Sequence, residues 1–208
     1  MSPTRILLCL ALGLGLPAAA ERPHFGFGVH IDAPVGALKT DLDGKLGGGA
    51  NFQVTFDLTP RLSVRPRFDL DYMRVSHHKR AGTNFEEEVG FGSVGFGADL
   101  VGILTGERNR GLYWTAGAGA LRWFQTYNAT DRNGSTSTST TDTKRNRFSA
   151  YGAYGLGWQF NRLVGVEVRN VISRYDSPQT AGLQAPFNDV PTEGRTASVV
   201  QTGVTFRW

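Results

Sequence analysis

Apolar residues recur at every second position over most of this chain, and that period of two limits its fold more than any other feature. In the run His24–Asp32, the odd positions are Phe, Phe, Val and Ile, whereas the even positions are His, Gly or Asp. Successive side chains of a β-strand point to opposite faces of the sheet, so the run predicts a strand with one apolar and one polar face. Seven further runs share the pattern: Ala50–Leu58, Leu62–Tyr72, Glu87–Leu104, Leu112–Ala120, Phe148–Phe160, Val164–Arg169 and Val200–Trp208. The sequence therefore predicts an all-β protein of eight strands.

Most of these runs are longer than a soluble strand. A tilted membrane strand needs ~9–11 residues, whereas strands of soluble proteins average ~5–6. Lipid offers no hydrogen bonds to the backbone, so a sheet that crosses a membrane has to close on itself. We therefore expect an eight-stranded antiparallel up-and-down transmembrane β-barrel with meander topology, its apolar face outward in lipid. A soluble secreted barrel, apolar inside, has the same period and is the alternative.

The predicted connections alternate between long and short. The long ones are Ala33–Leu46, Ser76–Glu86, Thr126–Arg147 and Asp176–Gly194, and the short ones are Thr59–Arg61, Thr105–Gly111 and Asn161–Leu163. Outer-membrane barrels have short periplasmic turns and long outer loops. The order therefore predicts that both termini are periplasmic and that the long loops lie outside the cell.

The first twenty residues have the pattern of a cleaved signal peptide. Arg5 precedes the apolar run Ile6–Leu16, and Pro17 and three alanines lead to a small-residue cleavage site before Glu21. We expect residues 1–20 to be removed and residues 21–208 to form the barrel. Cys9 is the only cysteine, and it lies too early in the apolar run for a lipid anchor.

The charge of the chain is mildly positive, with a formal net charge of +4 spread along the sequence. Charge that is not gathered into a basic patch gives no sign of nucleic-acid binding. The partners expected instead are outer-membrane lipid and lipopolysaccharide, with the protein as a monomer.

Aromatic residues lie near the predicted strand ends, where membrane barrels carry two interfacial girdles. The predicted girdle residues are Phe56, Trp114, Trp158 and Phe160 at the periplasmic ends, and Tyr72, Trp123, Tyr127 and Tyr175 at the outer ends.

The chain ends on an alternating strand with Val204, Phe206 and Trp208. This ending resembles the C-terminal signature of bacterial outer-membrane barrels, and the whole chain resembles the small eight-stranded family that includes outer membrane protein A and the outer membrane proteins X and W. The resemblance implies a location in the outer membrane and contact with the barrel-assembly machinery during biogenesis.

The polar face predicts what fills the barrel. An eight-stranded barrel is just wide enough for its own side chains, and buried charges need partners. Pairing across the short turns sets Gln53 opposite Arg67 and Gly157 opposite Glu167. We expect an interior ion-pair network of Arg65, Arg67, Asp69, Asp71, Asp99, Glu167, Arg169 and Arg207. The network either fills the lumen or gates a narrow pore.

Other motifs predict little chemistry. The stretch Gly90–Gly95 matches a dinucleotide-binding glycine pattern, but no helix follows it. The same stretch breaks the alternation, which predicts a β-bulge near Gly92–Ser93 or an inward Phe91. His24 and His30 share a face but lie ~20 Å apart along a strand, so they do not bind one metal. We expect no cofactor and no metal site.

The leading functional hypothesis is a non-enzymatic barrel with a structural, adhesive or binding role through its long extracellular loops. One alternative is a narrow channel for small or hydrophobic solutes. The other is a hydrolase that modifies lipid A, because Ser76, His77 and Glu86–Glu88 lie in one predicted loop region and supply the residue types of a hydrolase.

Overall fold

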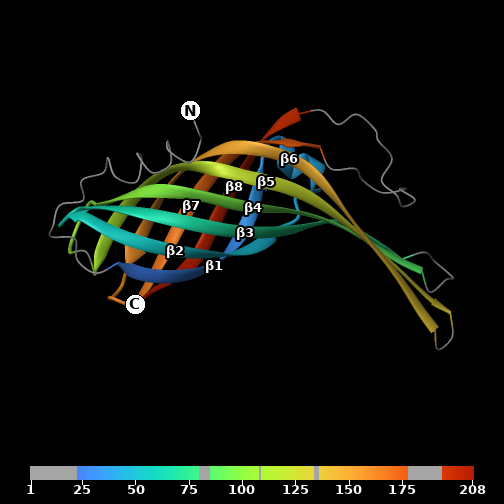
Figure 1. Ribbon diagram of the computed structural model, residues 1–208, viewed down its shortest axis with the longest axis horizontal. Helices are drawn as coiled ribbons and strands as arrows, with labels where there is room; N and C mark the ends of the chain where they lie inside the picture. The colour runs from blue at the N-terminus through green and yellow to red at the C-terminus, as the bar shows by residue number, and fades with distance from the viewer. Residues whose placement is uncertain (1–22, 80–84, 108, 134–135, 178–193) are drawn as a thin grey trace, which may run out of the picture.

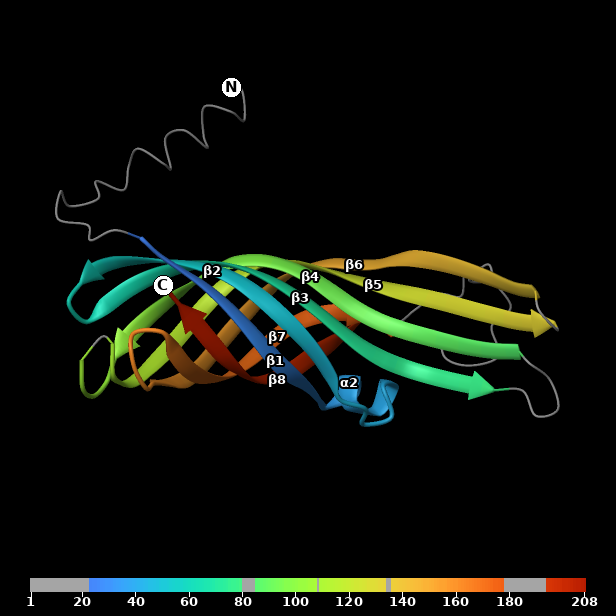
Figure 2. The same cartoon turned by 90° about the horizontal axis from the view of Figure 1, so that it is seen from below.

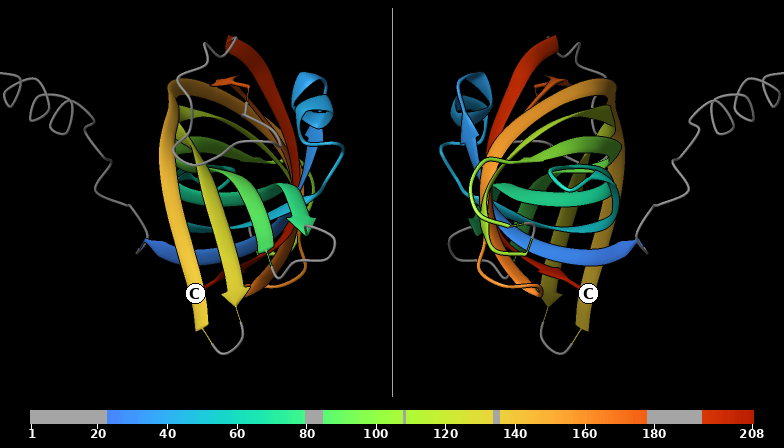
Figure 3. Two further views of the ribbon diagram at one scale, coloured as in Figure 1. Left: turned by 90° about the vertical axis from the view of Figure 1, so that its right-hand side faces the viewer. Right: turned by 90° about the vertical axis from the view of Figure 1, so that its left-hand side faces the viewer.

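The protein folds into one closed antiparallel β-barrel in which every strand pairs with its sequence neighbours and β1 pairs with β8. The computed structural model describes residues 23–79, 85–107, 109–133, 136–177 and 194–208. The strands are β1 (His24–Val35), β2 (Gly47–Thr59), β3 (Leu62–Lys79), β4 (Phe85–Ile103), β5 (Gly111–Asn133), β6 (Thr136–Gln159), β7 (Val164–Asp176) and β8 (Gly194–Arg207). Figures 1 and 3 show the strands in this order around the barrel. The predicted fold class and meander topology are confirmed.

The two faces of the barrel wall have the predicted polarity. Outward positions carry large apolar side chains, of which Phe96 is 65% exposed, whereas the inward Asp99 on the same strand is 1% exposed. A wall of this kind suits hydrocarbon outside and polar groups inside. It excludes the alternative of a soluble secreted barrel, whose whole interior would be apolar. Among the described residues, no helix is long and apolar enough to cross a membrane.

The two described ends of the chain meet at one end of the barrel, which we call the terminal end. Phe25 and Trp208 exchange two backbone hydrogen bonds of 3.2 and 3.0 Å there. The short connections lie at the same end, and the side chain of Asn161 accepts hydrogen bonds from the backbone of Leu163 and Val164, which fixes a tight turn. We call the opposite end the loop end.

Four strands continue past the barrel rim at the loop end and form what we call the projecting sheet (Figures 1 and 2). It consists of Arg74–Lys79, Phe85–Gly90, Thr126–Asn133 and Thr136–Thr143. The predicted loops Ser76–Glu86 and Thr126–Arg147 are therefore wrong over most of their length. Polarity predicted a loop, but His77, His78 and Lys79 of β3 pair in register with Glu88, Glu87 and Glu86 of β4, so the backbone is extended there.

A short helix, α2 (Ala37–Asp41), follows β1 and lies beside β1 and β8 at the loop end (Figure 2). Its Leu38 and the following Leu42 are fully buried. They belong to an apolar cluster that fills the loop half of the barrel, and we call it the upper core. Its members are Leu38, Leu42, Met73, Val75, Val89, Phe91, Leu121, Trp123, Tyr127, Tyr151, Ala153, Tyr175, Ala197 and Val199.

The upper core corrects three of the predicted girdle residues. Trp123 is 2% exposed, and Tyr127 and Tyr175 are also buried inside the barrel. They have the parity of the inward face, so their nearness to strand ends did not place them in lipid. Tyr72, by contrast, is exposed on the outside as a girdle residue requires.

The break in alternation on β4 comes from an inward Phe91, which was one of the two predicted causes. Phe91 points inward and stacks on Trp123 with ring centroids 4.9 Å apart. The bulge lies on the neighbouring strand, between Arg74 and Ser76, rather than at Gly92–Ser93. Phe91 therefore pairs as an ordinary inward residue of the upper core.

Candidate functional site

Six charged side chains from three strands meet inside the barrel below the upper core, and we call them the lumen network. They are Arg65, Arg67 and Asp69 of β3, Asp99 of β4, and Glu167 and Arg169 of β7. All six are buried. Three guanidinium groups face three carboxylates, so the formal charges balance where water is largely excluded.

Two carboxylates hold the lumen network together. Glu167 lies 2.8 Å from Arg65 Nη1, accepts a hydrogen bond from Arg67 Nη1 at 3.0 Å and another from the Tyr113 hydroxyl at 3.1 Å. Asp99 accepts from Arg65 Nη2 at 2.9 Å and from Arg169 Nη2 at 2.8 Å. Each carboxylate thus bridges two arginines, which offsets the cost of burying the charges.

Glycine positions make room for these large groups. A Cβ atom at Gly157 would overlap the ring of Tyr113, and one at Gly117 would overlap the carboxylate of Asp99. The predicted pairings of Gln53 with Arg67 and Gly157 with Glu167 are both present in the register. Local sequence therefore sets which inward residues face a glycine.

The other two residues of the predicted network lie apart from it. Arg207 donates a hydrogen bond to Asn109 at 2.6 Å near the terminal end. Asp71 lies nearer the loop end, where it accepts hydrogen bonds from Ser93 at 2.7 Å and Gln201 at 3.0 Å and contacts His30 at 2.8 Å. The structure thus divides the eight predicted residues among three places.

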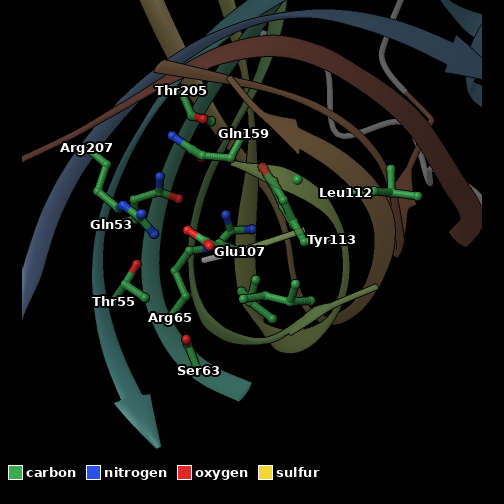
Figure 4. A pocket seen from close by; sticks show the side chains of 13 residues that line it. Gln53, Thr55, Ser63, Arg65, Glu107, Leu112, Tyr113, Gln159, Thr205 and Arg207 are labelled. Atoms are coloured by element: carbon green, nitrogen blue, oxygen red, sulfur yellow. The ribbon is translucent and has the colours of Figure 1, made fainter. Parts of the chain in front are cut away.

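A recess with both polar and apolar lining residues opens below the lumen network at the terminal end (Figure 4). Gln53, Thr55, Ser63, Gln159, Thr205 and Arg207 are among the side chains that line it. Arg65 and Tyr113 also line it, and both belong to the contacts around Glu167. From the terminal end inward, the lumen therefore holds a recess, a charged layer and an apolar layer.

Sequence reasoning missed Tyr113, His30, Asp32 and Gln201. His30 and Asp32 are visible as inward residues of β1, but their neighbours Asp71 and Gln201 come from β3 and β8. The predicted separation of the two histidines holds, since His24 lies 3.6 Å from Asp57 and not near His30's carboxylates. Within the described part of the chain, His30, Asp32 and Asp71 form the one group with three potential metal ligands close together.

The remaining predicted residues lie on the outside near the terminal end. Trp158, Phe160, Phe206 and Trp208 are exposed, and Phe56 and Trp114 are half-buried. Val204 and Phe206 pair with Val29 and Phe27 of β1, so the last strand closes the barrel.

The comparisons with known proteins agree with this architecture. The model of the family described as outer membrane protein beta-barrel domain matches residues 6–207. A search of curated proteins found no match. The crystal structure of Ail, the attachment invasion locus protein of Yersinia pestis, in complex with the heparin analogue sucrose octasulfate has a TM-score of 0.51 at 11% identity, covering 90% of this chain and 100% of Ail. A major outer membrane protein from Thermus thermophilus has a TM-score of 0.48 at 12% identity, covering 90% and 100%. At 11% identity the likeness to Ail concerns the fold alone.

Proposed function

Because the chain belongs to the outer membrane protein β-barrel domain family, we propose that it is a non-enzymatic binding protein with a closed lumen that presents its projecting sheet outside the cell. In this orientation both termini are periplasmic, the barrel wall contacts outer-membrane lipid and lipopolysaccharide, and the loop end faces outward. In this proposal the protein is a monomer, and closure leaves no open edge within the membrane to which another chain could add a strand.

The observation that carries the proposal is that, among the residues the structure describes, two strand edges of the projecting sheet have no partner strand and are open. Pairing of β2 with β3 ends at Gly47 and Met73, although β3 continues to Lys79. Pairing of β6 with β7 begins at Tyr151, although β6 starts at Thr136. Open edges present backbone N–H and C=O groups to which an extended segment of another protein adds as a new strand.

The β6 edge is the better binding surface of the two. On the β3 edge, the side chain of Lys45 donates a hydrogen bond to the Val75 carbonyl at 2.7 Å, which occupies an edge acceptor and places a charge there. Among the described residues, the β6 edge over Thr136–Phe148 has no strand partner on its β7 side. It is also longer, and it is rich in threonine, which favours extended backbone.

The test is a barrel with a shortened hairpin. Residues 127–142 are replaced by Asn-Gly, which makes a tight turn between the paired residues Thr126 and Thr143. Cells that express this variant should adhere to surfaces coated with serum proteins no better than cells with empty vector, whereas the full-length protein should increase adherence. Heat-modifiable gel migration checks that the variant barrel is folded. Equal adherence of the variant and the full-length protein would refute the binding role of the sheet.

The narrow channel is the second candidate, and the filling of the lumen argues against it. A solute entering the recess meets Arg65 and Tyr113, and the upper core lies beyond the charged layer. Purified protein in planar bilayers should therefore give no single-channel events, and regular conductance steps would favour the channel.

The backbone also argues against the lipid-A hydrolase. Ser76 and His77 are consecutive residues of β3, and consecutive residues of a strand belong to opposite faces of its sheet. A serine and its general base need to be within hydrogen-bond reach. The mass spectrum of lipid A should be the same from cells with and without the gene.

A further inference from the structure

Three potential metal ligands and an amide gather inside the barrel between the lumen network and the upper core. His30 and Asp32 come from β1, Asp71 from β3 and Gln201 from β8. His30 Nε2 lies 2.8 Å from Asp71 Oδ1 and 3.4 Å from Asp32 Oδ1, and Gln201 Nε2 lies 3.2 Å from His30 Nε2. The ligand atoms of His30, Asp32 and Asp71 all lie within 4.8 Å of one another.

Asp32 lacks the partners that a buried carboxylate needs. Its side chain is 0% exposed, and within the described part of the chain neither of its oxygens has a hydrogen-bond partner. The arginines of the lumen network are held by Asp69, Asp99 and Glu167, and the ion-pair partner of both Asp32 and Asp71 is His30. Two carboxylates therefore share one imidazole where unpaired charge is costly.

Glycines on the neighbouring strands leave the space in which these groups meet. A Cβ atom at Gly49 of β2 would overlap His30 Nε2 and lie 2.6 Å from Asp71 Oδ1. A Cβ atom at Gly203 of β8 would lie 2.6 Å from the Cβ of His30. Both glycines pair with His30 in the sheet, so His30 is flanked by positions without side chains. The absent side chains let ligands from β1 and β3 approach each other across β2.

We propose that His30, Asp32 and Asp71 bind one Zn²⁺ ion inside the barrel, with Gln201 as the fourth ligand. Zn²⁺ takes histidine nitrogen and carboxylate oxygen at about 2.0–2.2 Å, so tetrahedral ligands lie roughly 3.3 Å apart. The His30–Asp32 distance already matches, and the His30–Asp71 contact opens by about half an ångström. The buried Gln201 Oε1 has no hydrogen-bond partner among the residues that the structure describes. A half-turn of the amide places this oxygen where Nε2 now lies, facing His30 and Asp71.

The ion would stabilise the closed barrel. Its ligands come from β1, β3 and β8, and β1 and β8 are the strands whose pairing closes the barrel. The open barrel does not hold β1 and β8 together, so binding favours the closed state. This role is independent of the projecting sheet, and its failure would leave the proposed binding function intact.

The experiment compares full-length protein folded into detergent micelles from urea with EDTA or with ZnCl₂, and then desalted. We expect about one zinc ion per folded chain by elemental analysis and a higher urea midpoint for heat-modifiable migration in the zinc sample. Folding with CoCl₂ should give the visible absorption bands of tetrahedral Co²⁺. No retained zinc, or an unchanged midpoint, would overturn the proposal.

Two variants separate metal binding from structure. Asp32→Asn keeps the shape of the side chain and removes a buried charge, so without zinc it should fold at least as well as the unaltered chain, yet retain no zinc and lose the cobalt bands. Asp71→Asn should likewise retain no zinc and lose the cobalt absorption bands. The matched control is His24→Gln, which alters the other inward histidine–aspartate pair and should retain one zinc ion. Retention of zinc by Asp32→Asn would overturn the proposal.

Discussion

Replacing Asp99 by asparagine tests whether the lumen network is held by charge balance. Asp99 is 1% exposed and contacts Arg65 at 2.9 Å and Arg169 at 2.8 Å. Asparagine has the same shape, so Asp99→Asn creates no cavity and leaves three guanidinium groups facing two carboxylates. Loss of one partner from a buried ion pair costs about 3–5 kcal/mol, and we expect the free energy of unfolding to fall by that amount.

The assay is equilibrium unfolding in urea of protein folded into phospholipid vesicles, followed by tryptophan fluorescence. Arg147→Gln is the matched control, because it also breaks an arginine–aspartate pair of 2.9 Å, but one that is partly exposed at the loop end. Exposed pairs contribute about 0–1 kcal/mol. Equal losses of stability for Asp99→Asn and Arg147→Gln would refute the reasoning.

A second arm removes the cation that Asp99→Asn leaves without a partner. The double variant Asp99→Asn/Arg169→Gln has two guanidinium groups and two carboxylates, so charge balance is restored. The two changes should therefore be coupled by about 0.5–3 kcal/mol, with the double variant more stable than the sum of the single losses predicts. Strict additivity would show that the contacts, and not the charge balance, matter.

Three further predictions concern the wall, the upper core and the lumen network. Phe96→Arg places a charge on the lipid face and should reduce the free energy of unfolding in vesicles by about 2–4 kcal/mol; no loss would mean that this face is not in hydrocarbon. Leu38→Asp buries an unpaired charge under α2 and should speed trypsin cleavage at the adjacent lysine while barrel migration on gels stays unchanged; an unchanged cleavage rate would mean that α2 does not depend on this contact. Gly117→Val pushes against Asp99 and should cost about 1–3 kcal/mol, whereas Gly152→Val, with nothing within 4 Å of its added Cβ, should stay within about 0.5 kcal/mol.

Polarity does not predict the backbone structure at the loop end. The charged stretch after Val75 and the serine–threonine run were predicted to be loops, because such residues bury little apolar surface. The structure pairs the backbone of these stretches as strands, in register between β3 and β4 and between β5 and β6. Pairing depends on the register between two strands, and composition does not carry it.

The sequence by itself determined the faces of the wall. The period of two is local, and it sorted Phe96 to the lipid and Asp99 to the lumen. The same parity places Trp123 and Tyr175 inside, where both are buried, although their closeness to strand ends predicts girdle positions.

Only the tertiary structure decided which inward residues meet. Arg67 and Glu167 are 100 positions apart and lie on β3 and β7, and His30 and Asp71 face each other across β2. Alternation fixes the side of the sheet on which a residue lies. The height of one strand relative to a strand across the lumen depends on the tilt and stagger with which the whole barrel closes, and these are properties of the closed barrel and not of any one segment.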